Sequence, residues 1–214
     1  MNEFEAYNRY LPKDAVVYDI GAHIGLMSQH FLDLGAKKVL AFEPSENNFK
    51  EIEKRFGSDE RVKIFKVGLH EKHYECITPF KDCRASYGEI MDKEQHISYA
   101  ILPEMVSLLN LEPPSFVKMD IEGMEAIVLK TCKFLFTGPR PIFFVEIHAK
   151  PKECQIQTYK DNPHFLWPDE GGFNFNDFKK YDYVMVEQIG QFTSQEVDYT
   201  PKPSEHKSVL FIPK

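Results

Sequence analysis

The chain has 214 residues, of which 43% are hydrophobic and 28% charged, and its formal net charge is −7. This composition is that of a folded globular protein and excludes a disordered or a collagen-like chain. The length fits a single domain, residues 1–214, better than two domains of ordinary size. No apolar run approaches the roughly 20 residues that cross a bilayer, and the N-terminal stretch is acidic where a signal peptide is basic. We therefore expect no membrane association and a cytoplasmic location.

The negative charge disfavours a nucleic-acid partner, because a phosphate backbone is repelled by a chain of this sign. No run of Lys or Arg offsets that repulsion. The four cysteines form no CxxC pair, so a structural zinc site is not expected and the thiols are predicted to be reduced.

β-rich runs and amphipathic stretches alternate along the chain, which is typical of an α/β fold with crossover helices. Helices are predicted where apolar residues recur at helical spacing, as Phe49, Ile52 and Phe56 do after the capping residue Ser45. The predicted strands are 16–20, 38–42, 62–67, 116–120, 142–147, 183–189 and 208–212. The predicted helices are 25–35, 46–56, 103–110 and 122–136. The crossovers imply a mostly parallel, Rossmann-like sheet with helices on both faces and an antiparallel edge.

Two stretches depart from this alternation. Residues 69–101 contain two possible short strands, 74–78 and 97–101, and are predicted to be an insertion or a lid. Residues 159–183 are rich in aromatic side chains, which either pack in the core or form a stacking wall for a flat or sugar-like molecule, with Trp167 at its centre.

The loop after the first predicted strand reads DIGAHIG over residues 19–25. A strand, a glycine turn and a helix in succession place backbone N–H groups at a ligand. Three residues separate the two glycines, whereas a dinucleotide fingerprint requires G-x-G-x-x-G. Asp19 at the strand end can accept a hydrogen bond from an ammonium group, so the loop favours a cofactor with an amino-acid end, S-adenosylmethionine. The candidate binding residues of the loop are Asp19, Gly21, Ala22, His23 and Gly25.

A second acid, Glu43, directly follows the second predicted strand. A carboxylate at this place suits a ribose, because it accepts hydrogen bonds from both vicinal hydroxyls. NAD-binding proteins use the same arrangement, so Glu43 indicates a nucleoside without selecting the cofactor. The alternative to an S-adenosylmethionine-binding protein is an NAD-dependent oxidoreductase, but the spacing of the glycines argues against it.

A charged constellation follows the fourth predicted strand. With a two-residue period, Lys118, Asp120 and Glu122 share one face, and three charges on one face of a central strand need partners. They either pair among themselves, with Glu122 at a helix N-terminus, or face a ligand at the carboxyl edge of the sheet. The next strand ends in Glu146 and His148, which reach the same edge.

These groups suggest two kinds of chemistry. Carboxylates and an imidazole can act as general bases, and together they can also hold a divalent metal ion. The metal-ligand candidates are Asp120, Glu122, Glu146 and His148, although a metal is not the favoured interpretation.

In this order and spacing, the motifs DIGAHIG, AFEP, KMDIEGME and VEIH resemble the FkbM family of S-adenosylmethionine-dependent methyltransferases, over roughly residues 15–148. The resemblance implies a class I methyltransferase fold with a seven-stranded sheet and methyl transfer to a hydroxyl of a small molecule or sugar. Residues 150–180 are then expected to shape the acceptor side. By position, the cofactor motifs correspond to Asp19, Gly21 and Glu43. The active-site edge corresponds to Lys118, Asp120, Glu122, Glu146 and His148.

The expected reaction is direct displacement at the sulfonium methyl, in which the enzyme mainly aligns the reactants. His148 is the first candidate for the base that takes the hydroxyl proton, because an imidazole titrates near neutrality, and Asp120 is the second. Lys118 is expected to orient or neutralise the carboxylates. Besides the NAD-dependent enzyme, a non-catalytic methyltransferase-like binding module and an RNA methyltransferase stay open, the latter opposed by the charge of the chain.

Overall fold

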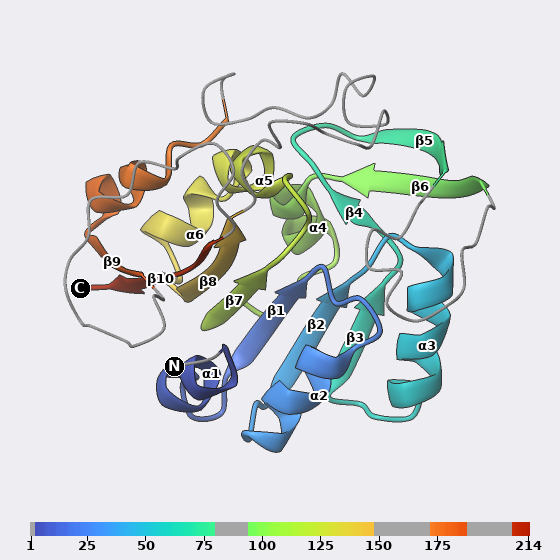
Figure 1. Cartoon of the computed structure of the whole chain (residues 1–214), viewed down its shortest axis with the longest axis horizontal. Helices are drawn as coiled ribbons and strands as arrows, with labels where there is room; N and C mark the ends of the chain where they lie inside the picture. The colour runs from blue at the N-terminus through green and yellow to red at the C-terminus, as the bar shows by residue number, and fades with distance from the viewer. Residues whose placement is uncertain (1–2, 80–93, 148–171, 188–206) are drawn as a thin grey trace.

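The computed structural model describes residues 3–79, 94–147, 172–187 and 207–214 of the chain. All seven predicted strands are present and form one sheet in the order β3-β2-β1-β7-β8-β10-β9 (Figure 1). The first five of these are parallel neighbours, and β10 runs antiparallel to both β8 and β9. The predicted mostly parallel sheet with an antiparallel edge is therefore confirmed. The strands are β1 (Val16–Ile20), β2 (Lys38–Phe42), β3 (Val62–Phe65), β7 (Phe116–Met119), β8 (Ile142–Ile147), β9 (Tyr183–Glu187) and β10 (Lys207–Pro213).

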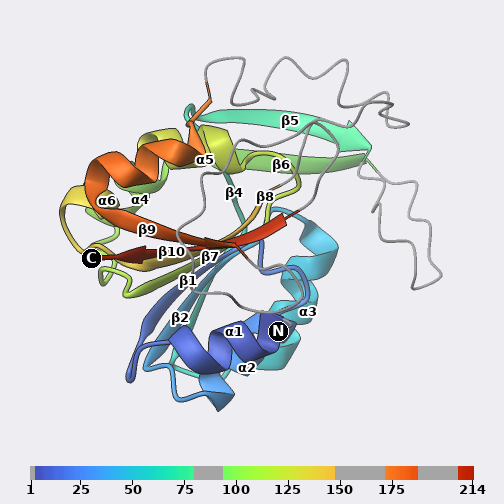
Figure 2. The ribbon, with the colours of Figure 1, turned by 60° about the vertical axis from the view of Figure 1, so that its left-hand side comes forward.

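Helices cover both faces of the sheet (Figure 2). One face carries α1 (Glu3–Tyr10), α2 (Leu26–Asp33) and α3 (Glu46–Phe56). The other carries α4 (Leu102–Leu108), α5 (Glu125–Thr131), α6 (Lys133–Thr137) and the 3-10 helix η3 (Phe175–Tyr181). Alternate strand residues supply the two cores, since Phe116 packs in the first and Val117 in the second. None of the described helices has the length and apolar character needed to span a membrane.

A second, three-stranded sheet lies beside the carboxyl ends of the parallel strands (Figure 1). It has the order β4-β6-β5 and consists of β4 (Gly68–Leu69), β5 (Tyr74–Pro79) and β6 (Glu94–Ala100). The strands predicted at 74–78 and 97–101 are thereby confirmed, whereas β4 was not predicted. Residues 80–93 lie outside the described part of the chain, so the lid stays a prediction.

Two helical predictions were wrong or incomplete. The single helix expected over 122–136 begins only at Glu125 and is interrupted at Cys132, where α5 ends and α6 starts. The delay has a backbone cause, because Glu122 and Gly123 both have positive φ angles and form a turn. Helix α1 was not predicted, since its eight residues bury only Ala6 and Tyr7.

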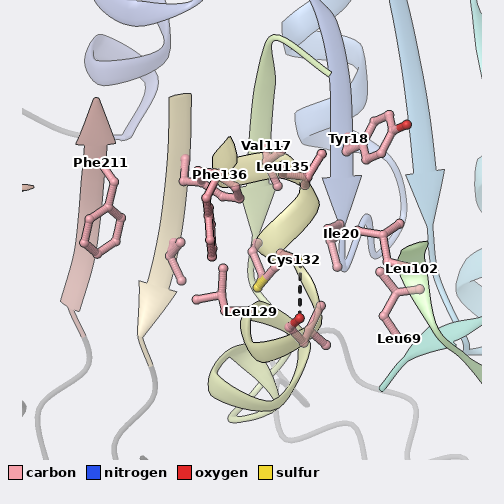
Figure 3. Packing of buried hydrophobic residues seen from close by; sticks show 14 of the residues in the cluster. Tyr18, Ile20, Leu69, Leu102, Val117, Leu129, Cys132, Leu135, Phe136 and Phe211 are labelled. Atoms are coloured by element: carbon pink, nitrogen blue, oxygen red, sulfur yellow. Dashed lines mark hydrogen bonds between the residues drawn. The ribbon is translucent and has the colours of Figure 1, made fainter. Parts of the chain in front are cut away.

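The described part of the aromatic segment packs in the core. Phe178 stacks on Phe211 with ring centroids 3.8 Å apart, and its ring also meets Phe136 edge-on at 5.0 Å. Figure 3 shows Phe136 and Phe211 in this cluster, together with residues of β1, β7 and α5. Core packing is thus confirmed for residues 172–183. Trp167 lies outside the described residues, as does most of the 150–180 segment.

Candidate active site at the carboxyl edge of the sheet

The turn between β1 and α2 passes directly against the chain that follows β7. Gly21 has a φ of +81°, and a Cβ atom added there would lie 1.9 Å from the carbonyl oxygen of Asp120. Gly25 has a φ of +82°, and its added Cβ would lie 2.7 Å from the Phe56 ring. Both glycines are therefore required by backbone conformation and by space.

The N–H groups of this turn are used within the fold. Gly21 and Ala22 both donate to the carbonyl of Phe42, at 3.0 and 3.1 Å, and His23 donates to Glu43. The expectation that these N–H groups point at a ligand therefore does not match the structure. What the turn offers a ligand is the partly exposed backbone of Gly21, which has no side chain of its own.

Glu43 joins the turn to the start of α3. Its Oε2 accepts from the N–H of His23 at 2.9 Å, and its Oε1 accepts from the N–H of Ser45 at 2.9 Å and from the Asn48 amide at 3.2 Å. A carboxylate has about four acceptor sites, so Oε2 keeps capacity for one more donor. Burial raises the pKa of the Glu43 carboxyl, although the three hydrogen bonds oppose that rise. The single remaining site fits one ribose hydroxyl, whereas the sequence led us to expect two.

Lys118 connects the three chain segments that meet at this edge. Its ammonium donates to the Gly21 carbonyl at 2.7 Å and lies 3.5 Å from Asp19 Oδ1 and 3.6 Å from Asp120 Oδ2. Burial by itself would lower the pKa of Lys118, but the neighbouring carboxylates, Asp19 first among them, outweigh burial and raise it. The predicted pairing of Lys118 with Asp120 is present, and the contact with the glycine turn was not anticipated.

Asp19 is fully buried beneath the turn. Its Oδ2 accepts a 2.6 Å hydrogen bond from the hydroxyl of Ser28, and its Oδ1 faces Lys118. Direct acceptance from a cofactor ammonium was the expected role. In this geometry Asp19 instead reaches the turn through Lys118, and a direct contact stays a prediction.

Glu125 is a buried residue of this edge that the sequence analysis did not single out. It is 1% exposed, and its Oε1 accepts from the N–H groups of Ile121 and Gly123, both at 3.1 Å. These contacts fix the turn that carries Asp120 and place Glu125, rather than Glu122, in the first turn of α5. An acid two residues after a glycine at a helix start is a signal that could have identified it.

Glu146 lies on β8 at the same level and on the same face as Asp120. The register pairs Met119 with Val145, so the next residues of the two strands are neighbours, and Ser208 of β10 pairs with Glu146 on its other side. The structure therefore brings Asp19, Lys118, Asp120 and Glu146 together. His148 lies outside the described residues.

An aromatic cluster adjoins the Glu43 side of the site. Tyr74 and Tyr99 stack with centroids 4.4 Å apart and an interplanar angle of 9°, and the buried His70 meets Tyr74 edge-on. Burial raises the pKa of Tyr99 to about 12, with smaller contributions that include the charge of Glu43. This cluster was missed because β4 and β6 pair across about 30 residues of sequence.

Within the described ranges, no group of three or more His, Cys, Asp or Glu side chains is placed to hold a metal ion. One member of the predicted ligand set, His148, falls outside those ranges. Asp120, Glu122 and Glu146 thus do not form such a group by themselves, and the predicted set of four that includes His148 stays a prediction.

Solved structures share this fold. An FkbM methyltransferase from Methylobacillus flagellatus KT superposes with a TM-score of 0.56 at 15% identity, over 98% of this chain and 50% of that one. A fibrillarin pre-rRNA processing protein from Methanococcus jannaschii gives a TM-score of 0.51 at 15% identity, over 94% of this chain and 66% of that one. The chain thus spans half the length of the first of these proteins. At such identities the likeness establishes the fold alone.

Comparison with functionally curated proteins gives no match. The family comparison is decisive, because the model of the methyltransferase FkbM domain matches residues 19–188, which includes the glycine turn, Glu43 and the charged edge. The chain belongs to the FkbM methyltransferase domain family.

Proposed function

We propose that this protein is an S-adenosylmethionine-dependent methyltransferase that transfers a methyl group to a hydroxyl of a small molecule or sugar. Membership of the FkbM family supports methyl transfer and use of this cofactor. The observation that carries the proposal is the junction of the glycine turn, Glu43 and Lys118 at the carboxyl edge of a parallel sheet, where ligands of open α/β sheets bind.

The residues present fit the cofactor. The partly exposed backbone of Gly21 is open to the methionine end, and the remaining acceptor site on Glu43 Oε2 suits a ribose hydroxyl. The buried carboxylates around Lys118 favour a ligand with positive charge, because Asp19, Asp120 and Glu146 all act on this single ammonium. The bound cofactor supplies an activated methyl group on a sulfonium.

The protein's own residues hold the reactants in line and move one proton. Lys118 fixes the Gly21 carbonyl, and Glu125 fixes the turn that carries Asp120, so the glycine turn and the segment after β7 are held in one arrangement. A hydroxyl is a weak nucleophile, so a base that takes its proton as the new bond forms accelerates the transfer. We assign that base to His148 first and to Asp120 second.

Cofactor binding is the first test of this proposal. Titration calorimetry should show S-adenosylmethionine and S-adenosylhomocysteine binding to the purified protein, with no heat from NAD. Glu43→Ala should weaken S-adenosylhomocysteine by about tenfold or more, because it removes a charged acceptor and three contacts that shape the site. Glu51→Ala, which alters an exposed acid of α3, is the matched control and should bind like the wild type. A folded wild-type sample that ignores both sulfur nucleosides at millimolar concentration would rule the proposal out.

The base is tested by turnover with a hydroxyl acceptor. His148→Ala is expected to lower kcat by about 10²-fold or more while the affinity for S-adenosylhomocysteine stays unchanged, since general-base catalysis contributes about 10²–10⁴-fold. Asp120→Asn is measured in parallel, and a larger loss there reverses the order of the two candidates. If both variants keep near-wild-type turnover, neither residue is the base.

A further inference from the structure

The hydroxyl of Tyr7 is buried and has no hydrogen-bond partner among the residues that the structure describes. Tyr7 lies on α1 and is 1% exposed, and its Oη atom has no accessible surface and no donor or acceptor within reach. A buried hydroxyl that makes no hydrogen bond is costly, so a phenylalanine would serve the packing of this site better. The retention of the hydroxyl needs a reason other than packing.

The tyrosine ring fixes where the hydroxyl points. It packs on Phe116 of β7 and Phe144 of β8, with centroids 6.1 and 4.7 Å away. Two residues further along each strand, on the same face, stand Lys118 and Glu146. A helical side chain leans toward the N-terminus of its helix, which places Oη nearer to the carboxyl edge than the ring is.

The helix itself is anchored at that edge. Glu3, one turn before Tyr7, accepts a 3.1 Å hydrogen bond from the hydroxyl of Ser208, which is the residue that pairs with Glu146 across the sheet. Residues four apart share a helix face, so Glu3 and Tyr7 both face the sheet. Helix α1 therefore holds Tyr7 on the face of the sheet that carries the carboxylates of the site.

Asp19 supplies the matching acceptor. Its Oδ1 is buried and, like Tyr7 Oη, makes no hydrogen bond, although it faces Lys118 at 3.5 Å. Burial raises the pKa of Tyr7 well above its ordinary value, and the charges of nearby carboxylates, Glu3 first and Asp19 next, raise it further. The phenol therefore stays protonated and can act as a donor at any physiological pH.

We propose that Tyr7 is a positioning residue of the cofactor site, whose hydroxyl donates to the Asp19 carboxylate in the ligand-bound protein and so fixes the contact of Lys118 with the glycine turn. The proposed contacts connect Tyr7 of α1 to Asp19. Asp19 in turn faces Lys118, which donates to the carbonyl of Gly21. This inference rests on the proposed function, since it concerns the site assigned to the cofactor. It gives the N-terminal helix a role in ligand binding that its position outside the sheet does not suggest.

The test compares two buried tyrosines that lose only their hydroxyl. Tyr7→Phe removes a hydroxyl that makes no hydrogen bond to a described residue. Tyr18→Phe removes a hydroxyl that donates to the Glu112 carbonyl at 2.9 Å, away from the site. Two quantities are measured for each variant and for the wild type. They are the Tm of the ligand-free protein and the Kd for S-adenosylhomocysteine by calorimetry.

Tyr7→Phe is expected to leave the ligand-free Tm unchanged or raised and to weaken S-adenosylhomocysteine by about tenfold, the loss of one hydrogen bond to a charged group. Tyr18→Phe is expected to do the reverse, with a lowered Tm and an unchanged Kd. Wild-type affinity in Tyr7→Phe overturns the inference while leaving the proposed function intact. A Tyr7→Phe protein that fails to fold, or that loses Tm as Tyr18→Phe does, assigns the hydroxyl a structural role and also overturns it. A wild type that binds no S-adenosylhomocysteine refutes the proposed function, and the inference with it.

Discussion

Replacing Lys118 by methionine is expected to destabilise the protein by about 3–5 kcal/mol, the largest effect that any single side chain of the site should produce. The Lys118 side chain is 7% exposed, and its ammonium contacts Asp19, Asp120 and the Gly21 carbonyl together. Methionine fills a similar volume but leaves the fully buried Asp19 carboxylate without a cation. Most of the destabilisation comes from the buried Asp19 charge that is left without a cation, rather than from the lost attraction to Lys118.

Urea unfolding monitored by circular dichroism measures this difference. Lys130→Met is the control, because Lys130 pairs with Glu71 at 2.8 Å while about half exposed, and exposed pairs contribute about 0.2–1 kcal/mol. Adding Asp19→Asn to Lys118→Met should recover part of the loss, since the double variant no longer buries an isolated charge. A single-variant loss no greater than that of the control would show that the Lys118 network does not stabilise the fold.

The contribution of Lys118 should be constant through the neutral range. Its neighbours raise the pKa of Lys118 in the folded protein above that of the unfolded chain. A cation with a raised folded pKa stabilises fully below its unfolded pKa, about 10, and the stabilisation is lost only as the pH rises through the folded value. The difference between wild type and Lys118→Met should therefore stay level from pH 6 to pH 9.

The sheet could be predicted from local pattern, and most of the helix boundaries followed from it. The five parallel strands are short β-rich runs in the sequence, and the glycine turn and Glu43 fall at strand ends that the pattern locates well. The interruption at Cys132 has no such signature, because the apolar residues of α5 and α6 continue through it. The turn at Glu122 and Gly123 depends on positive φ angles that a helix-like sequence conceals.

For the candidate site, the sequence predicted which residues lie at this edge but not which contacts they make. Sequence placed Asp19, Glu43, Lys118 and Asp120 at one edge, because strand ends of a parallel sheet meet there. It did not reveal that Lys118 binds the Gly21 carbonyl or that the N–H groups of the turn are already engaged, since those contacts depend on the register of β1 with β7 and β2. Tyr7 was not identified because its relation to the site arises from packing across the sheet.

Gly21→Ala is expected to abolish cofactor binding and to destabilise the protein by about 2–3 kcal/mol more than a glycine replacement that meets no obstacle. The added Cβ would lie 1.9 Å from the Asp120 carbonyl oxygen and 2.9 Å from its carbonyl carbon. These are backbone atoms, so no side-chain rotation relieves the contact. The chain after β7 would have to move away from β1, which displaces Asp120 and separates Lys118 from the turn.

Gly35→Ala isolates the steric part of this effect. Gly35 also has a positive φ, +90°, but an added Cβ there meets nothing within 4 Å. It therefore carries only the conformational cost of a left-handed residue, about 1–2 kcal/mol, and should bind S-adenosylhomocysteine like the wild type. Urea unfolding and calorimetry on the two variants separate the costs, since both share the conformational penalty and only Gly21→Ala has the clash. Equal stability losses and equal affinities in the two variants would mean that the turn and the segment after β7 are further apart than the structure places them. The site would then lack the rigid junction on which the proposed methyl transfer depends.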